Sequence, residues 1–242
     1  MIDVLIFTAK QAGENILNYY GNAEYEDKDD GSFTSPLTQA DLAAHATIVK
    51  ALKTSFPNVP IISEEDVPSY DERKNWQEFF LVDPLDGTKE FLKQTGEFTV
   101  NIAYISPKKQ VAVVYAPATE DCWYSDGEKS YKNGQEIKVS EDASPLRVVA
   151  SKSHFSEETK DYVERLGKPY ELLQYGSSLK ICAVADGSAD IYPRLGPTME
   201  WDTAAAHIIL EHAGGDIVDL EGKPLEYNKE DLHNPFFIAK KK

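Results

Sequence analysis

The stretch that decides the fold is Phe79-Phe80-Leu81-Val82-Asp83-Pro84-Leu85-Asp86-Gly87-Thr88. Its apolar first half predicts a buried β-strand. Pro84 predicts that the strand ends there, because proline has no N–H group to donate to a neighbouring strand. Gly87 permits a tight turn, and Thr88 is expected to begin a helix. The free N–H groups at the start of a helix favour a phosphate group.

Asp83 and Asp86 place two carboxylates at the end of this predicted strand. Carboxylates arranged in this way can converge on a pair of divalent cations, which prefer hard oxygen ligands. The same residues would also suit an Asx-turn and a helix cap, with both acids in solvent. The motif alone leaves both interpretations open.

Other acidic residues stand at the ends of predicted elements, and each has a simple structural explanation. Glu64-Glu65 follows a short apolar run and can be a charged loop. Asp202 lies at the start of an apolar helix and can complement the helix dipole. Asp41 comes three residues after Thr38, an arrangement close to the capping box.

The hydrophobic pattern divides the chain into two halves. In the first half we expect helices at 2–20 and 38–56, a loop between them at 21–36, and β-rich runs at 61–62, 79–82, 99–105, 111–115, 122–124 and 130–131. The second half alternates strands with helices at 156–166, 178–185 and 202–212. A polar segment at 140–145 separates the halves, so we predict an N-terminal α+β domain over 1–142 and a C-terminal α/β domain over 143–242.

The composition is that of a globular protein with an acidic surface. The 242 residues are 41% hydrophobic, and the formal net charge is −16. That charge repels nucleic-acid backbones and anionic membranes, so neither is an expected partner. Most of the acids are expected to solvate the surface. Divalent cations bound by a few of them would reconcile the charge with a phosphate-bearing substrate, because bound ions dominate the local field.

The two cysteines and the N-terminus indicate a cytoplasmic enzyme. Cys122 and Cys182 belong to no CxxC motif and are expected to be buried, reduced thiols. No apolar run approaches the roughly 20 residues of a membrane span, and Met1-Ile2-Asp3 does not begin a signal peptide. Peripheral membrane attachment is left open.

Taken together, the acidic motifs resemble those of the lithium-sensitive phosphatase superfamily, which includes inositol monophosphatases and fructose-1,6-bisphosphatases. The matching motifs, in chain order, are Asp41, Glu64-Glu65, 83–88 and Trp201 to Ala205. The resemblance covers nearly the whole chain. It implies a layered αβαβα sandwich and a phosphatase that uses two or three Mg²⁺ ions and is inhibited by Li⁺.

The resemblance also implies which residues bind metal. These are the carboxylates of Glu64, Asp83, Asp86 and Asp202 and the backbone carbonyl of Leu85. Asp83 is expected to bridge two cations, and Asp86 and Asp202 to complete the second site. Oxygen ligands of this kind are what Mg²⁺ requires in any case.

Thr88, Asp41 and Glu64 are the residues to which the resemblance assigns catalysis. Thr88 matches the threonine that orients or deprotonates the attacking water, and Asp41 matches its partner. A threonine hydroxyl alone is a poor base, so the role depends on a hydrogen bond to Asp41 and on a metal-lowered pKa of the water. No covalent intermediate is required.

Five segments resemble the bacterial 3′(2′),5′-bisphosphate nucleotidases, which convert adenosine 3′,5′-bisphosphate, a by-product of sulfate activation, to AMP and phosphate. They are Asp83 to Phe91, Gly96 to Asn101, Gly176 to Lys180, Tyr192-Pro193-Arg194 and Gly196 to Asp202. The expected substrate-binding set is Glu64, Asp86, Gly87, Thr88, Ser151, His154, Gly176, Ser178, Lys180, Arg194 and Asp202.

Two cationic residues in that set favour a substrate with a second phosphate. Lys180 stands at the entrance to a predicted helix, where it can meet a phosphate that the metals do not touch. Its simpler explanation is a solvated helix lysine, and that of His154 is a loop residue capping the next helix. Arg194 lies about where inositol monophosphatases carry an acid, which disfavours inositol.

Three alternatives remain open at this point. An inositol or sugar phosphatase of the same superfamily would share every metal ligand and differ only in the pocket. A catalytically silent protein on this fold would usually lack a ligand, whereas none is missing here. A non-enzymatic phosphate-binding module would not need the pair Asp41 and Thr88. The sequence leaves open the oligomeric state, the preference between 3′- and 2′-phosphates, and activity on 3′-phosphoadenylyl sulfate.

Overall fold

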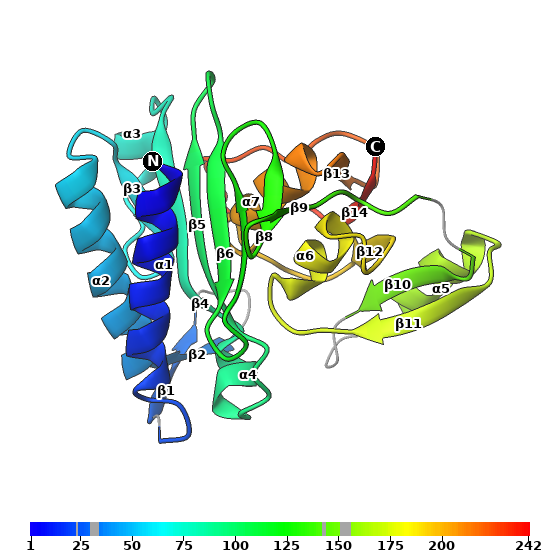
Figure 1. Cartoon of the computed structure of the whole chain (residues 1–242), viewed down its shortest axis with the longest axis horizontal. Helices are drawn as coiled ribbons and strands as arrows, with labels where there is room; N and C mark the ends of the chain where they lie inside the picture. Colours follow the sequence, from blue (N-terminus) through cyan, green and yellow to red (C-terminus); the bar gives the residue numbers. More distant parts are fainter. Residues whose placement is uncertain (23, 30–33, 142–143, 151–155) are drawn as a thin grey trace.

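Five layers of secondary structure stack in the order α/β/α/β/α, as the family resemblance implies (Figure 1). The computed structural model describes residues 1–22, 24–29, 34–141, 144–150 and 156–242. The helices of the three α layers are α1 (Ile2–Leu17) with α2 (Gln39–Ser55), then α6 (Leu179–Ala185) with α7 (Glu200–His212), then α5 (Glu157–Arg165).

The first sheet lies between the pair α1 and α2 on one face and α7 on the other. Its seven strands in spatial order are β3 (Ile61–Ser63), β4 (Phe79–Asp86), β5 (Thr99–Ile105), β6 (Val111–Ala116), β7 (Asp121–Ser125), β8 (Ser130–Lys132) and β9 (Gln135–Glu136). Only β3 and β4 run parallel; the other neighbours are antiparallel. Because helices cover both faces, β4 and β6 are apolar and buried almost throughout.

The second sheet is mixed and has five strands. In spatial order they are β11 (Tyr170–Gln174), β10 (Leu146–Ala150), β12 (Ile191–Arg194), β14 (Phe237–Lys241) and β13 (Gly215–Asp219). Helix α7 is buried between the sheets, and a single hydrophobic cluster contains Leu81 of the first sheet, Ile209 of α7 and Phe237 of the second. The two sheets fall on either side of residue 142, but the division into two domains there stays a prediction.

The prediction of a loop over 21–36 is wrong, because the structure contains an antiparallel hairpin in that segment. Its strands are β1 (Tyr25–Asp29) and β2 (Thr34–Thr38). The segment carries no alternation of apolar and polar residues, so the hydrophobic pattern does not reveal strands that pair through their backbones. Two short helices complete the fold, α3 (Tyr70–Arg73) and α4 (Thr88–Leu92).

Strand β4 does not end at Pro84 as predicted but continues to Asp86. Asp83 lies opposite Asn101 of β5, and Asp86 lies opposite Thr99, so β4 carries one extra residue between these two pairs. A β-bulge of this kind leaves a residue unpaired, which accommodates the missing N–H group of Pro84. It also re-aims the side chains that follow.

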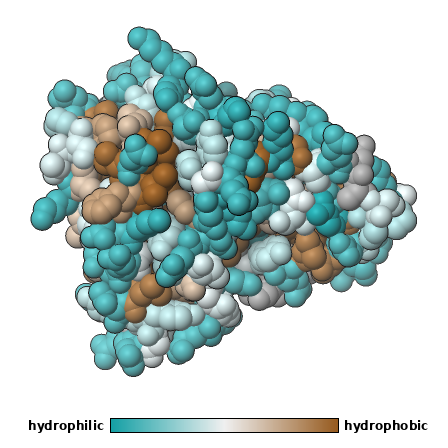
Figure 2. All heavy atoms as spheres, in the orientation of Figure 1, coloured by the Kyte–Doolittle hydropathy of each residue, from teal (hydrophilic) through white to brown (hydrophobic). Residues whose placement is uncertain are grey.

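The surface agrees with the acidic composition. Figure 2 shows the molecule in the orientation of Figure 1. Hydrophilic residues cover most of the visible face, and hydrophobic residues gather on the side where α1 lies. Cys122 and Cys182 are free and buried, as expected. Among the described residues no helix combines the length and the apolar character needed to cross a membrane.

Candidate active site

Three carboxylates from distant parts of the sequence converge at one end of the first sheet. Oxygen atoms of Asp83, Asp86 and Asp202 all lie within 4.8 Å of one another. Strand β4 supplies the first two, and the first turn of α7 supplies Asp202. Glu64 follows β3, which is parallel to β4, and its N–H donates to the carbonyl of Val82 at 3.1 Å. Glu64 therefore stands at the same end of the sheet.

Burial and mutual repulsion raise the pKa of two of these acids. The pKa of Asp83 is raised well above its usual range, chiefly by burial and then by the charge of Glu64. The pKa of Asp202 is raised well above its usual range by burial and then by the charge of Asp86. A divalent cation would offset both effects, because it replaces lost hydration and neutralises the repulsion. The set of hard oxygen donors suits Mg²⁺.

The local hydrogen bonds in the structural explanations of Asp83 and Asp202 are present, but Asp83 is 1% exposed and not in solvent as that explanation required. Asp83 Oδ1 accepts a hydrogen bond from the N–H of Leu85 at 3.0 Å, which is the expected Asx-turn. Asp202 Oδ2 accepts from the N–H of Met199 at 2.8 Å at the start of α7. A carboxylate offers about four acceptor positions on two oxygens. Holding the local backbone therefore leaves room for a cation.

The two carboxylate oxygens of Asp41 make two different predicted contacts, one with Thr38 and one with Thr88. Its Oδ2 accepts from the N–H and Oγ1 of Thr38, at 2.8 and 2.6 Å, which completes the predicted capping box of α2. Its Oδ1 lies 3.3 Å from Oγ1 of Thr88. That hydroxyl also lies 3.1 Å from the carbonyl oxygen of Leu85, a predicted metal ligand. The structure thus brings the predicted pair Asp41 and Thr88 into contact beside the carboxylates.

Most of the predicted substrate-binding residues line one cavity beside these carboxylates. Its volume is about 160 Å³, and its lining includes Asp86, Gly87, Ser178, Lys180, Arg194 and Asp202. Gly87 has a left-handed backbone, with φ at 88°, and a Cβ there would lie 2.9 Å from the carbonyl oxygen of Glu97. The expected turn therefore requires glycine. Ser151 and His154 lie outside the described residues.

Lys180 is not the solvated helix lysine of its simpler explanation. It is only 7% exposed, and its Nζ donates to the carbonyl oxygen of Ser177 at 2.6 Å. Burial lowers the pKa of Lys180 to about 8. Arg194 donates through Nη2 to the carbonyl of Pro197 at 2.7 Å. Its Nε is buried without a hydrogen-bond partner within the described part of the chain, so it can receive an anionic ligand.

Two other cavities are candidates for binding the rest of a substrate, and only one of them shares residues with the cavity at the carboxylates. One of about 390 Å³ shares Lys89, Tyr192 and Arg194 with the catalytic cavity, which gives a substrate room beyond its reacting phosphate. The other is larger, about 580 Å³, and runs along Trp123 and Lys132. None of the three convergent carboxylates lines it, so volume alone would point to the wrong place.

Four polar residues hold Asp86 in place, a role that was not predicted from the sequence, where Ser178 was expected only to bind substrate. A single oxygen of Asp86, Oδ2, accepts from Ser177 Oγ at 2.6 Å, from the N–H of Ser178 at 2.6 Å and from Ser178 Oγ at 2.7 Å. Thr99 and Asn101 contact these serines from β5. Two polar residues spaced by two in an otherwise apolar strand were the available signal, because they share one face of the sheet.

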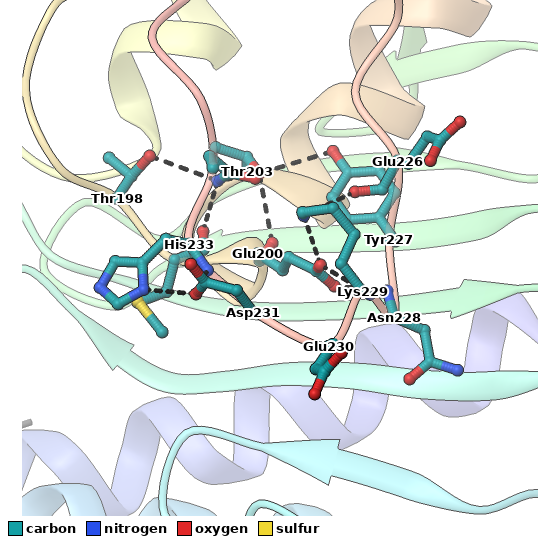
Figure 3. A network of polar contacts seen from close by, with 12 residues as sticks. Thr198, Glu200, Thr203, Glu226, Tyr227, Asn228, Lys229, Glu230, Asp231 and His233 are labelled. Atoms are coloured by element: carbon teal, nitrogen blue, oxygen red, sulfur yellow. Dashed lines mark hydrogen bonds and ion pairs between the residues drawn. The ribbon is translucent and has the colours of Figure 1, made fainter. Parts of the chain in front are cut away.

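A second network holds the start of α7 and therefore Asp202 (Figure 3). The side chain of Glu200 is fully buried and accepts from the backbone N–H groups of Asn228 and Lys229, at 2.5 and 3.1 Å. Lys229 Nζ lies 2.5 Å from the same carboxylate. Asn234 Nδ2 donates to the carbonyl of Met199 at 2.7 Å. The segment 226–234 thus fastens the first turn of α7.

We expect Lys229→Met to lower the free energy of unfolding by about 2 kcal/mol, because it leaves the buried Glu200 carboxylate without its cation. The estimate is below the usual cost of breaking a buried pair, since Lys229 is 28% exposed and two N–H groups still bond Glu200. Urea unfolding measures the change. Lys223→Met is the matched control, because the pair Lys223 and Glu221 is exposed, and we expect a change below about 0.5 kcal/mol there. Equal effects of the two substitutions would contradict the assigned role of Glu200.

The chain matches known proteins over nearly its whole length. The family model described as the inositol monophosphatase family matches residues 1–240. The protein named 3′(2′),5′-bisphosphate nucleotidase CysQ of Salmonella typhimurium is 45% identical, over 98% of each chain. Its namesake in Haemophilus influenzae is 35% identical, over 98% of this chain and 91% of that protein.

Solved structures agree with the sequence comparison. A crystal structure of CysQ from Bacteroides thetaiotaomicron, described as a bacterial member of the inositol monophosphatase family, superposes with a TM-score of 0.86. It is 38% identical, and the match covers 99% of this chain and 96% of that one. A Thermotoga maritima IMPase superposes with a TM-score of 0.80 at 26% identity, over 98% and 91% of the two chains.

Proposed function

Because this chain belongs to the inositol monophosphatase family, we propose that it is a Mg²⁺-dependent 3′(2′),5′-bisphosphate nucleotidase. It removes the 3′-phosphate of adenosine 3′,5′-bisphosphate to give AMP and phosphate, and so recycles the by-product of sulfate activation. The observation that carries the proposal is the convergence of Asp83, Asp86 and Asp202 beside a cavity lined by Lys180 and Arg194. The first feature suits phosphate-ester hydrolysis, and the second suits a substrate with another anionic group.

The proposed metal ligands are Glu64, Asp83, Asp86, Asp202 and the carbonyl of Leu85. Bound divalent cations would lower the pKa of the attacking water and neutralise the phosphate. Asp41 Oδ1 can accept the proton of the Thr88 hydroxyl. The oxygen of Thr88 can then accept from the attacking water and hold it in line with the phosphorus. This assignment gives a specific role to each member of the pair.

The buried Lys180 and the partly buried Arg194 are proposed to hold the remaining phosphate of the substrate. Lys180 has N–H groups besides the one that bonds Ser177, and Arg194 has its unpartnered Nε. Hydrogen bonds from cations to phosphate are stronger than neutral ones. The adjoining cavity that shares Arg194 and Tyr192 is the proposed place of the nucleoside. Gly176 is also expected to contact the nucleotide, and a Cβ there would lie 2.9 Å from the carbonyl oxygen of Glu97.

The proposal is tested by phosphate release with Mg²⁺ from adenosine 3′,5′-bisphosphate and from inositol 1-phosphate, measured side by side. We expect a kcat/KM at least about 100-fold higher for the nucleotide, because only the nucleotide offers a second phosphate to Lys180 and Arg194. Preference for inositol 1-phosphate would refute the proposed substrate while leaving the metal site in place. If phosphate is released from neither substrate, the proposed phosphatase activity is refuted.

We expect lithium chloride to inhibit this phosphatase progressively. The resemblance to the lithium-sensitive superfamily implies a cation site that Li⁺ can enter, and the carboxylate oxygens of the cluster are suitable ligands. Phosphate release at fixed Mg²⁺ is measured against rising LiCl. The same concentrations of NaCl control for ionic strength. Equal activity in both salts would contradict a lithium-sensitive site.

We propose that the enzyme works in the cytoplasm on a small-molecule substrate. Support comes from Cys122 and Cys182, which are free and buried as expected in a reducing compartment. The net charge of −16 gives no support to nucleic acid as a partner.

A further inference from the structure

We propose that Asn101 is a positioning residue, which orients the metal-binding carboxylate of Asp86 without touching substrate or metal. The inference rests on the proposed function, since Asp86 is a proposed metal ligand. Asn101 lies in β5, directly opposite Asp83 of β4, and is 1% exposed. A buried amide in an apolar strand costs free energy unless its polar atoms are paired, and the partners of Asn101 lead to the metal site.

The first link runs through Ser178. Asn101 Nδ2 lies 2.8 Å from Ser178 Oγ and 3.5 Å from Asp86 Oδ2. Because an amide nitrogen only donates, the hydroxyl of Ser178 accepts and must direct its own proton elsewhere. The acceptors within reach are Asp86 Oδ2, at 2.7 Å, and the carbonyl oxygen of Asp202, at 2.9 Å. Both belong to residues of the carboxylate cluster.

The second link fixes the amide of Asn101 itself. Thr99 Oγ1 lies 3.0 Å from Asn101 Oδ1 and can donate to it. The opposite orientation of the amide would place its oxygen against Asp86 Oδ2, where two acceptors would repel. Ser177 donates its single hydroxyl proton to Asp86 Oδ2. The 2.7 Å contact between Thr99 Oγ1 and Ser177 Oγ is therefore donated by Thr99, whose one proton is shared between Ser177 Oγ and Asn101 Oδ1. Strand β5 therefore reaches Asp86 by two routes.

These contacts leave Asp86 with one saturated oxygen. Oδ2 receives donors from Ser177 and Ser178, and both serines lie in the turn before α6. The other oxygen is the one available to a cation. Outer hydrogen-bond partners of metal ligands typically change metal affinity by about 10–100-fold when removed. Asn101 is at the base of this arrangement, because it holds Ser178 and is held by Thr99.

The test uses binding of Mn²⁺ alone to the full-length protein, followed by electron paramagnetic resonance. We expect Asn101→Leu to weaken Mn²⁺ binding by about 10-fold or more. At saturating Mn²⁺ we expect the KM for adenosine 3′,5′-bisphosphate to change by less than about twofold, because Asn101 contacts no substrate. The matched control is Val100→Ala, on the same strand and equally buried, which is expected to keep the wild-type affinity for Mn²⁺.

The outcomes separate failure of this inference from failure of the proposed function. Folded Asn101→Leu with wild-type Mn²⁺ affinity overturns the inference, and so does an equal loss in Val100→Ala. If Asn101→Leu does not fold, Ser178→Ala breaks the same link at its hydroxyl, and unchanged Mn²⁺ affinity in that variant overturns the inference as well. A wild-type protein that binds no Mn²⁺ refutes the proposed metal-dependent function instead.

Discussion

Asp83→Asn is expected to lower kcat for phosphate release by at least about 1,000-fold, which corresponds to roughly 4 kcal/mol of transition-state stabilisation. Asp83 is the proposed bridge between two cations, so its loss weakens both at once. Asparagine has the same shape and keeps a side-chain oxygen for the N–H of Leu85, which is bonded at 3.0 Å in the native chain. The substitution therefore removes charge while the local turn is retained.

The same variant is expected to be more stable than the native protein when no metal is present. Burial and neighbouring acids raise the pKa of Asp83 well above its usual range. An acid whose pKa is raised on folding makes the native state less stable as pH rises from the unfolded pKa towards the folded one. Neutral asparagine removes that cost. We expect the melting temperature in EDTA to rise by about 3 °C or more, the effect of roughly 1 kcal/mol in a chain of this size.

Thermal unfolding with and without Mg²⁺ separates this result from simple loss of structure. A ligand that binds only the native state raises its melting temperature, so Mg²⁺ should stabilise the native protein and leave Asp83→Asn unchanged. Asp71→Asn is the control, because that carboxylate is 88% exposed and outside the site. A lower melting temperature of Asp83→Asn in EDTA would show that Asp83 supports the fold. If Asp83→Asn keeps the kcat of the wild-type protein, Asp83 is not a metal ligand.

The proposed acidic ligands could be selected from the sequence because their ordered set resembles the motifs of a known superfamily, whereas each position alone is ambiguous. Asp83 and Asp86 follow an apolar run, and Asp202 opens an apolar helix. Ends of elements are where a side chain can leave the core and meet residues from elsewhere. Each position taken alone also had a structural explanation. The structure confirms the capping box of Asp41 and the Asx-turn of Asp83, but Asp83 is buried and not in solvent as that explanation required. The two kinds of explanation are compatible, because one carboxylate oxygen can bond the backbone while the other faces a ligand.

The remaining features depend on tertiary contacts that no local pattern contains. The hairpin of β1 and β2 pairs through its backbone, so its polar sequence resembles a loop. The burial of Lys180 follows from packing beside Tyr192, whose ring centroid lies 5.6 Å from Nζ. The proposed role of Asn101 depends on its register opposite Asp83 and on its contact with Ser178. Long-range contacts of this kind override local propensity.

Lys180→Met is expected to raise the KM for adenosine 3′,5′-bisphosphate by about 100-fold, since a buried charged hydrogen bond to phosphate contributes roughly 1.5–3 kcal/mol.

The kcat/KM of the wild-type enzyme should also fall above about pH 8, because burial lowers the pKa of Lys180 to about 8 and only the protonated amine attracts the second phosphate. The variant should lose that alkaline limb. Initial rates between about pH 6 and pH 10 measure both effects. Lys160→Met, at an exposed lysine of α5, is the control.

A substrate without the second phosphate separates the two roles that the geometry allows for Lys180. Its Nζ bonds the carbonyl of Ser177 at 2.6 Å, so it supports the turn that holds Asp86 as well as facing the cavity. If Lys180 binds the second phosphate, the variant loses far more with adenosine 3′,5′-bisphosphate than with adenosine 3′-monophosphate. If it only supports the turn, both substrates lose equally, and kcat falls with them. The ratio of the two KM changes therefore decides what the buried cation does.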